Sequence, residues 1–109
     1  MRNGIYRVWV NGPLASVSGA FVLNDGDLFA VNSSFGFVGR YEWKSGRLSA
    51  ELLCRRLSSD NPPVNLPNLD EFHLHLEGPA RREVANLTGT IAEAPGYTVP
   101  FEFAWLCDA

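Results

Sequence analysis

Residues 35–54 read FGFVGRYEWKSGRLSAELLC, and this stretch carries the clearest secondary-structure signal in the chain. Apolar or aromatic side chains and glycine occupy every second position, whereas the positions between them are mostly polar or charged. Successive side chains of a strand point to opposite faces, so this period of two predicts two strands, Phe35–Trp43 and Arg47–Leu57. Lys44-Ser45-Gly46 between them predicts a tight hairpin turn, because glycine readily adopts positive φ.

The same alternation recurs along nearly the whole chain, and turn-forming residues interrupt it about every eight to twelve residues. No window places apolar residues at helical spacing over three turns. Besides the two strands above, the pattern predicts strands at Gly4–Val10, Val17–Asn24, Leu28–Val31, Glu71–Glu77, Val84–Ala92 and Val99–Leu106. The proline-rich segment Ser58–Asn68 is the one long loop, and Gly19 and Gly89 are candidate β-bulges.

A chain of 109 residues with 46% hydrophobic content predicts a single domain over residues 1–109. Its strands, each with one apolar face, favour an all-β fold: an eight-stranded up-and-down antiparallel β-barrel, which leaves no free sheet edge. A two-sheet β-sandwich would use the same alternation and is the alternative. We expect large rings to line the barrel interior and mostly to fill it, although an open ligand cavity with the same lining is the second possibility. The lining residues expected are Tyr6, Phe35, Phe37, Tyr41, Trp43, Phe101, Phe103 and Trp105.

Charge and targeting signals narrow the function classes. Nine basic and twelve acidic residues give a net charge of −3 with the signs interspersed, which argues against nucleic-acid binding. No apolar stretch has the length of a signal peptide or a membrane span, so we expect a cytoplasmic protein. In that reducing compartment Cys54 and Cys107, both in apolar strands, are expected to be buried thiols.

No set of residues predicts a catalytic centre, and the interpretation is that the protein is not an enzyme and has no cofactor. His73 and His75 share one face of a strand with Glu71 and Glu77, but this pattern is also typical of a solvated outer face, which we favour over a metal site. Asp25 and Asp27 flank a turn glycine and so lack the burial that acid–base catalysis needs. Arg56 is the one mid-strand ionisable residue with inward parity, and a strand end explains it better than catalysis.

The segment Gly78-Pro79-Ala80-Arg81-Arg82 contains two adjacent arginines in a predicted turn. It lacks the glycine-rich strand-to-helix arrangement of a phosphate site. An exposed hairpin turn is the simpler interpretation, and a docking point for an acidic partner is the more specific one.

Glycines and aromatic residues recur here in a recognisable order: Gly4-Ile5-Tyr6-x-Val8, Asp25-Gly26, Phe35-x-Phe37-x-Gly39-x-Tyr41, Asp70-x-Phe72-x-Leu74-x-Leu76-x-Gly78 and Gly89. In order and spacing they resemble the GrlR family of small lipocalin-like bacterial proteins, negative regulators of type III secretion gene expression. The resemblance implies a cytoplasmic barrel, homodimeric, that represses by binding a transcriptional activator rather than DNA.

The resemblance also implies a partner-binding turn at Lys44, Ser45, Gly46 and Arg47. The matching turn in the best-known member of that family is acidic, whereas this one is neutral to basic, so it cannot recognise the same positively charged surface. The sequence therefore supports two functions: a regulatory protein that binds another protein, or a carrier or sensor of a small apolar ligand held inside the barrel.

Overall fold

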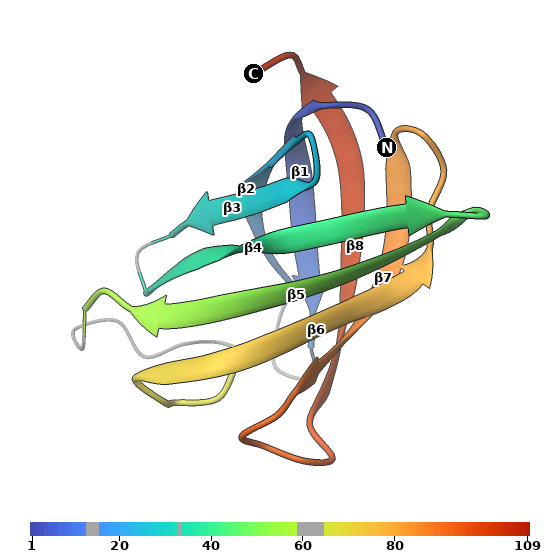
Figure 1. The fold of residues 1–109 in the computed structure, drawn as a ribbon. Coiled ribbons are helices and arrows are strands. Elements are labelled where there is room, and N and C mark those ends of the chain that lie inside the picture. The colour runs from blue at the N-terminus through green and yellow to red at the C-terminus, as the bar shows by residue number, and fades with distance from the viewer. Residues whose placement is uncertain (13–15, 33, 59–64) are drawn as a thin grey trace.

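The computed structural model describes residues 1–12, 16–32, 34–58 and 65–109, and these residues form eight β-strands and no helix (Figure 1). The predicted loop Ser58–Asn68 lies largely outside the described residues. The strands are β1 (Gly4–Asn11), β2 (Ser16–Asn24), β3 (Asp27–Val31), β4 (Phe35–Lys44), β5 (Arg47–Arg56), β6 (Glu71–Pro79), β7 (Val84–Ile91) and β8 (Thr98–Cys107).

The eight strands close into one antiparallel barrel in chain order, and β8 pairs back with β1. This confirms the up-and-down barrel and rules out the two-sheet sandwich. Gly19 pairs with Val8 and Gly89 with Val99 in regular register, so neither marks a bulge. The register shift between β1 and β8 lies instead between Ile5 and Tyr6.

Two hairpin turns follow directly from their residues. Asp25 (φ 50°) and Gly26 (φ 91°) connect β2 to β3, and Ser45 (φ 54°) and Gly46 (φ 75°) connect β4 to β5. Two successive residues with positive φ are typical of a type I′ turn, whose twist matches the twist of the flanking strands. The β4–β5 ladder that grows from the second turn runs from Lys44↔Arg47 to Phe35↔Arg56, as the alternation predicts.

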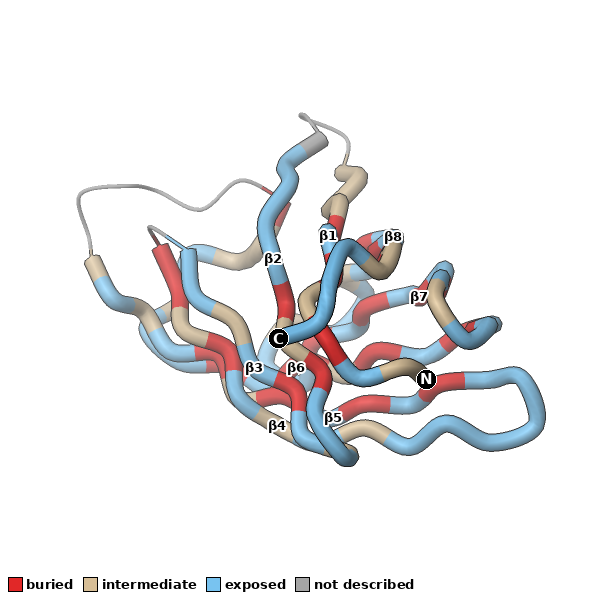
Figure 2. Tube along the Cα trace, turned by 90° about the horizontal axis from the view of Figure 1, so that it is seen from above, coloured by how far each residue is buried: buried red, intermediate tan, exposed pale blue. Residues whose placement is uncertain are grey.

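The core of the barrel is built from one face of every strand. Buried and exposed residues alternate along the strands in Figure 2, as a one-sided sheet requires. A continuous series of ring contacts, with centroids 5.2–6.4 Å apart, crosses the interior. In order of contact these rings belong to Tyr6, Phe103, Phe21, Phe37, Phe35 and Phe72.

Gly39 lets β4 and β5 approach closely in the middle of the longest hairpin. A Cβ atom at this position would lie 1.9 Å from the backbone oxygen of Glu51, far inside van der Waals contact. The obstacle is backbone in the cross-strand partner, which a side-chain movement cannot relieve. By contrast, a Cβ atom at Gly19 of β2 would meet nothing within 4 Å.

We expect Gly39→Ala to lower the free energy of unfolding by about 2–4 kcal/mol, because the strands must separate to admit the methyl group. Gly19→Ala is the matched control. It should leave the barrel as stable or raise its stability by up to about 1 kcal/mol, since alanine loses less backbone entropy than glycine on folding. Urea denaturation followed by tryptophan fluorescence measures both, and equal effects of the two variants would contradict the close approach.

Candidate functional site

The eight aromatic residues expected to line the interior divide into two groups. Five are at most 5% exposed: Tyr6, Phe35, Phe37, Phe101 and Phe103. Tyr41 and Trp105 are half-buried against the core, and Trp43 is 43% exposed. Trp43 has inward parity, but the ladder between β4 and β3 reaches only to Arg40, so Trp43 lies beyond the end of β3 and is not a wall of the interior. Phe21 and Phe72, which were not expected among the lining residues, complete the series of rings.

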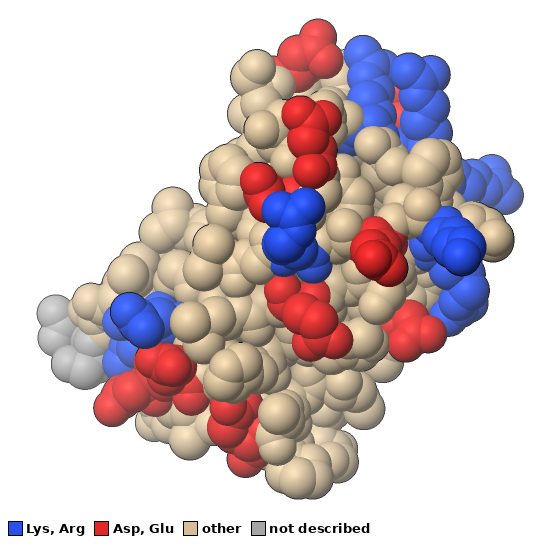
Figure 3. Space-filling view, viewed as in Figure 1, with Lys and Arg blue, Asp and Glu red and all other residues tan. Residues whose placement is uncertain are grey.

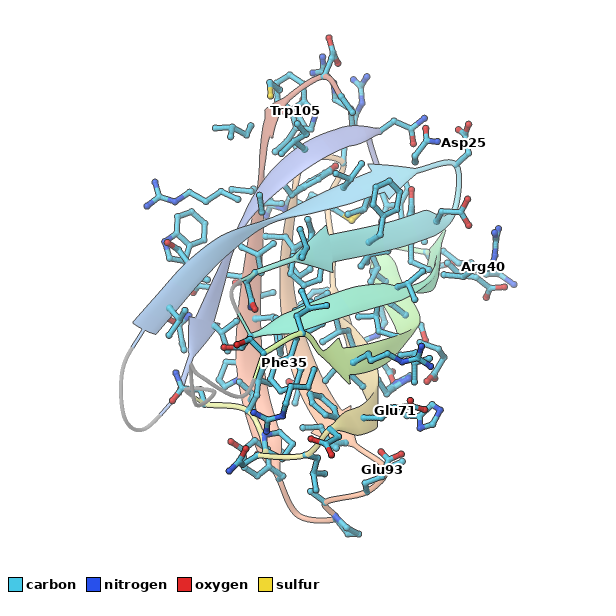
Figure 4. The ribbon with its side chains drawn as sticks, turned by 90° about the vertical axis from the view of Figure 1, so that its left-hand side faces the viewer. Asp25, Phe35, Arg40, Glu71, Glu93 and Trp105 are labelled. Atoms are coloured by element: carbon cyan, nitrogen blue, oxygen red, sulfur yellow. The ribbon has the colours of Figure 1, made fainter. Side chains whose placement is uncertain are left out.

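Tyr6 and Trp105 hold the first residues of the chain against the barrel. The Tyr6 hydroxyl donates to the carbonyl oxygens of Arg2 (2.6 Å) and Arg82 (3.2 Å). Burial, aided by Tyr41 and Glu83, raises the pKa of Tyr6 to about 12, so the hydroxyl keeps its proton. The Arg2 guanidinium lies 3.7 Å from the ring centroid of Trp105, whose position at the barrel end is visible in Figure 4.

The structure joins the two turns that the sequence analysis treated separately. The Ala80 amide, in the β6–β7 connection, donates to the Gly46 carbonyl at 2.9 Å. The Trp43 indole N–H donates to the Ala80 carbonyl, also at 2.9 Å. The predicted partner-binding turn and the arginine-bearing turn therefore form one surface, which we call the basic turn surface: Trp43, Lys44, Arg47, Arg81 and Arg82.

This surface collects cations that lack acidic partners. All nine Lys and Arg residues of the chain are described, and five of them form ion pairs: Arg2, Arg40, Arg47, Arg55 and Arg56. The other four have no carboxylate within ion-pair distance among the described residues: Arg7, Lys44, Arg81 and Arg82. Three of these four belong to the basic turn surface, and Figure 3 shows Lys and Arg side chains gathered on this side of the molecule.

Further contacts bear on the charge balance of this surface. Lys44 and Arg47 are directly opposite each other in the β4–β5 ladder, an arrangement in which like charges destabilise the hairpin. Among the described residues, Glu77 is the one carboxylate within ion-pair distance of Arg47, at 3.7 Å across an exposed surface. Burial, together with the charge of Arg82, lowers the pKa of the Met1 amino group.

A second cluster of ionisable groups lies on the outer face of β5 and β6. His73 Nδ1 is 2.6 Å from Glu93 Oε2, and the His73 amide donates to the other oxygen of the same carboxylate at 2.7 Å. His75 contacts Glu51 through Nδ1 and Glu77 through Nε2. Glu71 and Glu93 lie on the outside of the barrel in Figure 4.

These contacts change the pKa of both histidines. The hydrogen bond to Glu93 raises the pKa of the exposed His73. Burial by itself would lower the pKa of His75, but its hydrogen bonds with Glu77 and Glu51 outweigh burial and raise it. Each histidine is paired with its own carboxylates, and within the described ranges no three His, Cys, Asp or Glu residues group as a metal site requires.

Two further sequence expectations have clear outcomes. Cys54 is buried, and desolvation raises its pKa to about 12, so its thiol is unreactive. Cys107 is exposed, and the expectation of a buried thiol is wrong for it, because it ends β8 at the rim of the barrel.

Arg56 lies at the end of β5, and its side chain is 13% exposed. Its Nε is 3.2 Å from Asp70 Oδ1, and its guanidinium lies beside the ring of Phe35.

The outer face of β2–β5 carries apolar side chains in register. Val22, Phe29, Val38 and Leu53 are successive cross-strand partners, and Val31 lies on the same face as Phe29. We call these five residues the outer apolar patch. Phe29 is 44%, Val31 69% and Val38 59% exposed. In Figure 3 charged groups lie around uncharged surface on the face that contains β3, β4 and β5.

Comparisons with known proteins add no relative. Neither the models of known protein families nor the sequences of curated proteins match this chain. Among the described residues no helix has the length and apolar character to cross a membrane.

We expect Glu93→Gln to lower the pKa of His73 toward its ordinary value, because the substitution removes the negative charge and leaves at most a weaker, neutral hydrogen bond. The folded pKa lies above the unfolded one, so this pair stabilises the fold below the unfolded pKa and loses that contribution as pH rises through the folded pKa. Titration of the histidine ring protons by NMR measures the shift. Glu77→Gln is the control: it should lower the pKa of His75 and leave that of His73 unchanged, whereas an unshifted His73 in Glu93→Gln would disprove the assignment.

Proposed function

We propose that this protein is a regulatory binding module that acts by contact with another protein and not by catalysis. The observation that carries the proposal is the outer apolar patch. Phe29, Val31 and Val38 are 44–69% exposed on one outer face of the barrel. The rings inside the barrel are already packed against one another. Contiguous exposed apolar surface of this kind marks protein interaction sites.

The closed barrel supports binding through side chains. Each strand has a hydrogen-bonded neighbour on both sides, so the sheet has no edge strand to which a partner could add another strand. The patch has an aromatic ring and branched aliphatic side chains on a rigid sheet, and such groups lose little conformational entropy on binding. The ion pairs Arg40–Asp27, between β4 and β3, and Arg55–Glu71, between β5 and β6, neutralise exposed charges near the patch, so these charges do not impose a sign on the partner.

The partner we propose is a transcriptional regulator, which the resemblance to the GrlR family suggests. In that proposal the protein acts in the cytoplasm, as a homodimer, and lowers gene expression by occupying the regulator. The packed aromatic interior supports a stable scaffold for this role.

Affinity capture from the native host, followed by cross-linking, tests the proposal with two single-charge variants. Val38→Asp places a carboxylate in the centre of the outer apolar patch, where the partner would have to bury it without compensation. Thr90→Asp places the same charge on β7, on an exposed outer position away from the patch. We expect a transcriptional regulator to be recovered with the wild type and Thr90→Asp, cross-linked to β3 or β4, and lost with Val38→Asp.

Recovery of the protein alone in all three preparations would overturn the proposed function. Thermal unfolding of the three proteins provides the control for folding, because both substitutions lie at exposed positions and should change the melting temperature little.

A specific observation favours the second function, a carrier of a small apolar ligand. The ladder between β2 and β3 ends at Phe21↔Ala30, so residues 17–20 of β2 have no strand partner on that side among the described residues. Val17 and Gly19, inward by parity, are exposed there. In this second proposal a small ligand would enter the interior beside these residues. Native mass spectrometry of freshly purified protein tests it: an adduct of small mass that is lost on denaturation would make the carrier the leading function.

A further inference from the structure

We propose that the basic turn surface is a second binding site, which takes an acidic, aromatic-containing segment of a partner protein. The inference rests on the proposed function, in that it presumes a protein partner. It concerns a different surface from the outer apolar patch, and it names the chemical class of the group that binds there.

The first argument is the shortage of counter-charge. Lys44, Arg81 and Arg82 are exposed and have no ion pair among the described residues, whereas five other cations of the barrel are paired. The backbone hydrogen bond between Ala80 and Gly46 keeps the two turns together, so the cations cannot move far apart to reduce their repulsion. A carboxylate bound between them relieves the repulsion and forms charge-assisted hydrogen bonds.

The second argument is the position of Trp43. Its indole N–H is already satisfied by the Ala80 carbonyl, which fixes the ring between the two turns. With 43% of the residue exposed, the ring presents apolar surface beside the cations. Tryptophan and arginine are the residue types that contribute most to binding hot spots, and here they are adjacent and held by the fold.

The charge of the rest of the protein gives the site its selectivity. The net charge is −3, so an acidic segment is repelled by the molecule as a whole and attracted at this surface, which orients its approach. A nucleic-acid backbone fits less well, because it needs a longer track of cations. Glu77 and Glu83 lie in the elements that carry the two turns and would oppose an extended phosphate chain.

The test uses a fluorescent peptide with a central phenylalanine flanked on each side by three glutamates, and the same peptide with glutamine in place of every glutamate. Titration at low salt should give saturable binding of the acidic peptide alone, weakened by added salt. NMR of the labelled protein should show the largest amide shifts at residues 43–47 and 79–82. We expect the double variant Lys44→Glu with Arg81→Glu to bind at least about tenfold more weakly.

Arg7→Glu is the matched control, since Arg7 is the fourth cation without an ion pair in the described part of the chain and lies on β1 between Ala20 and Ala104. It should change the affinity less than about twofold, because its charge is remote from the two turns. Trp43→Phe retains a ring and should bind more weakly than the wild type while keeping the salt dependence. All variants alter exposed side chains, and thermal unfolding confirms that they fold.

Equal binding of the acidic and neutral peptides, equal loss in Arg7→Glu, or amide shifts centred on β3 and β4 would each overturn the proposal. So would tighter binding of a short DNA duplex through the same residues, which would assign the surface to nucleic acid instead. The capture experiment with Val38→Asp reports on the outer apolar patch alone. A failed peptide titration with a successful capture therefore refutes this site and leaves the proposed function unaffected. A successful titration with a failed capture supports this site and refutes the proposed function.

Discussion

The pairing of β8 with β1 is the constraint on which the rest of this structure depends. It brings Phe101 and Phe103 against Val10 and Val8, residues from opposite ends of the chain, and so closes the sheet. Only the closed sheet covers the rings that cross the interior, because each strand alone buries one side of its neighbours at most. Closure has a cost in chain entropy, which is offset by the favourable free energy of removing these rings from water together. It also removes the two edges that an open sheet would expose.

Closure has a direct effect on where the protein can bind others. Because the closed sheet has no edge strand, recognition is left to outward side chains and to turns. Up-and-down connectivity also places alternate turns at the same end, so the β4–β5 and β6–β7 turns become neighbours although a whole hairpin separates them along the chain. The hydrogen bond between Ala80 and Gly46 completes that arrangement. A pair of ordinary turns thus becomes a continuous charged surface with Trp43 at its centre.

The outer apolar patch has the same origin. Phe29 and Val38 are ordinary outward positions in their own strands, and single exposed apolar residues need no explanation. Antiparallel register places them side by side, with Val22 and Leu53 extending the row on either flank. Four residues that are unremarkable one by one become contiguous apolar surface, because register aligns positions of the same parity across strands.

Period-two alternation and turn chemistry were sufficient to predict the eight strands and most of their inward faces, since these depend on neighbours within a few residues. They favoured a barrel but were also compatible with a sandwich, and the pairing of β8 with β1 decides between the two. Parity could not show where the barrel ends, and for that reason Trp43 and Cys107 were both expected to be covered and are exposed. Phe21 joined the series of rings only through contacts across the interior. Tertiary structure alone determined three further features: the cations without partners among the described residues, the apolar residues that lie side by side, and the turns that contact each other. Each is a relation between segments that are distant in the sequence and are brought together when the sheet closes.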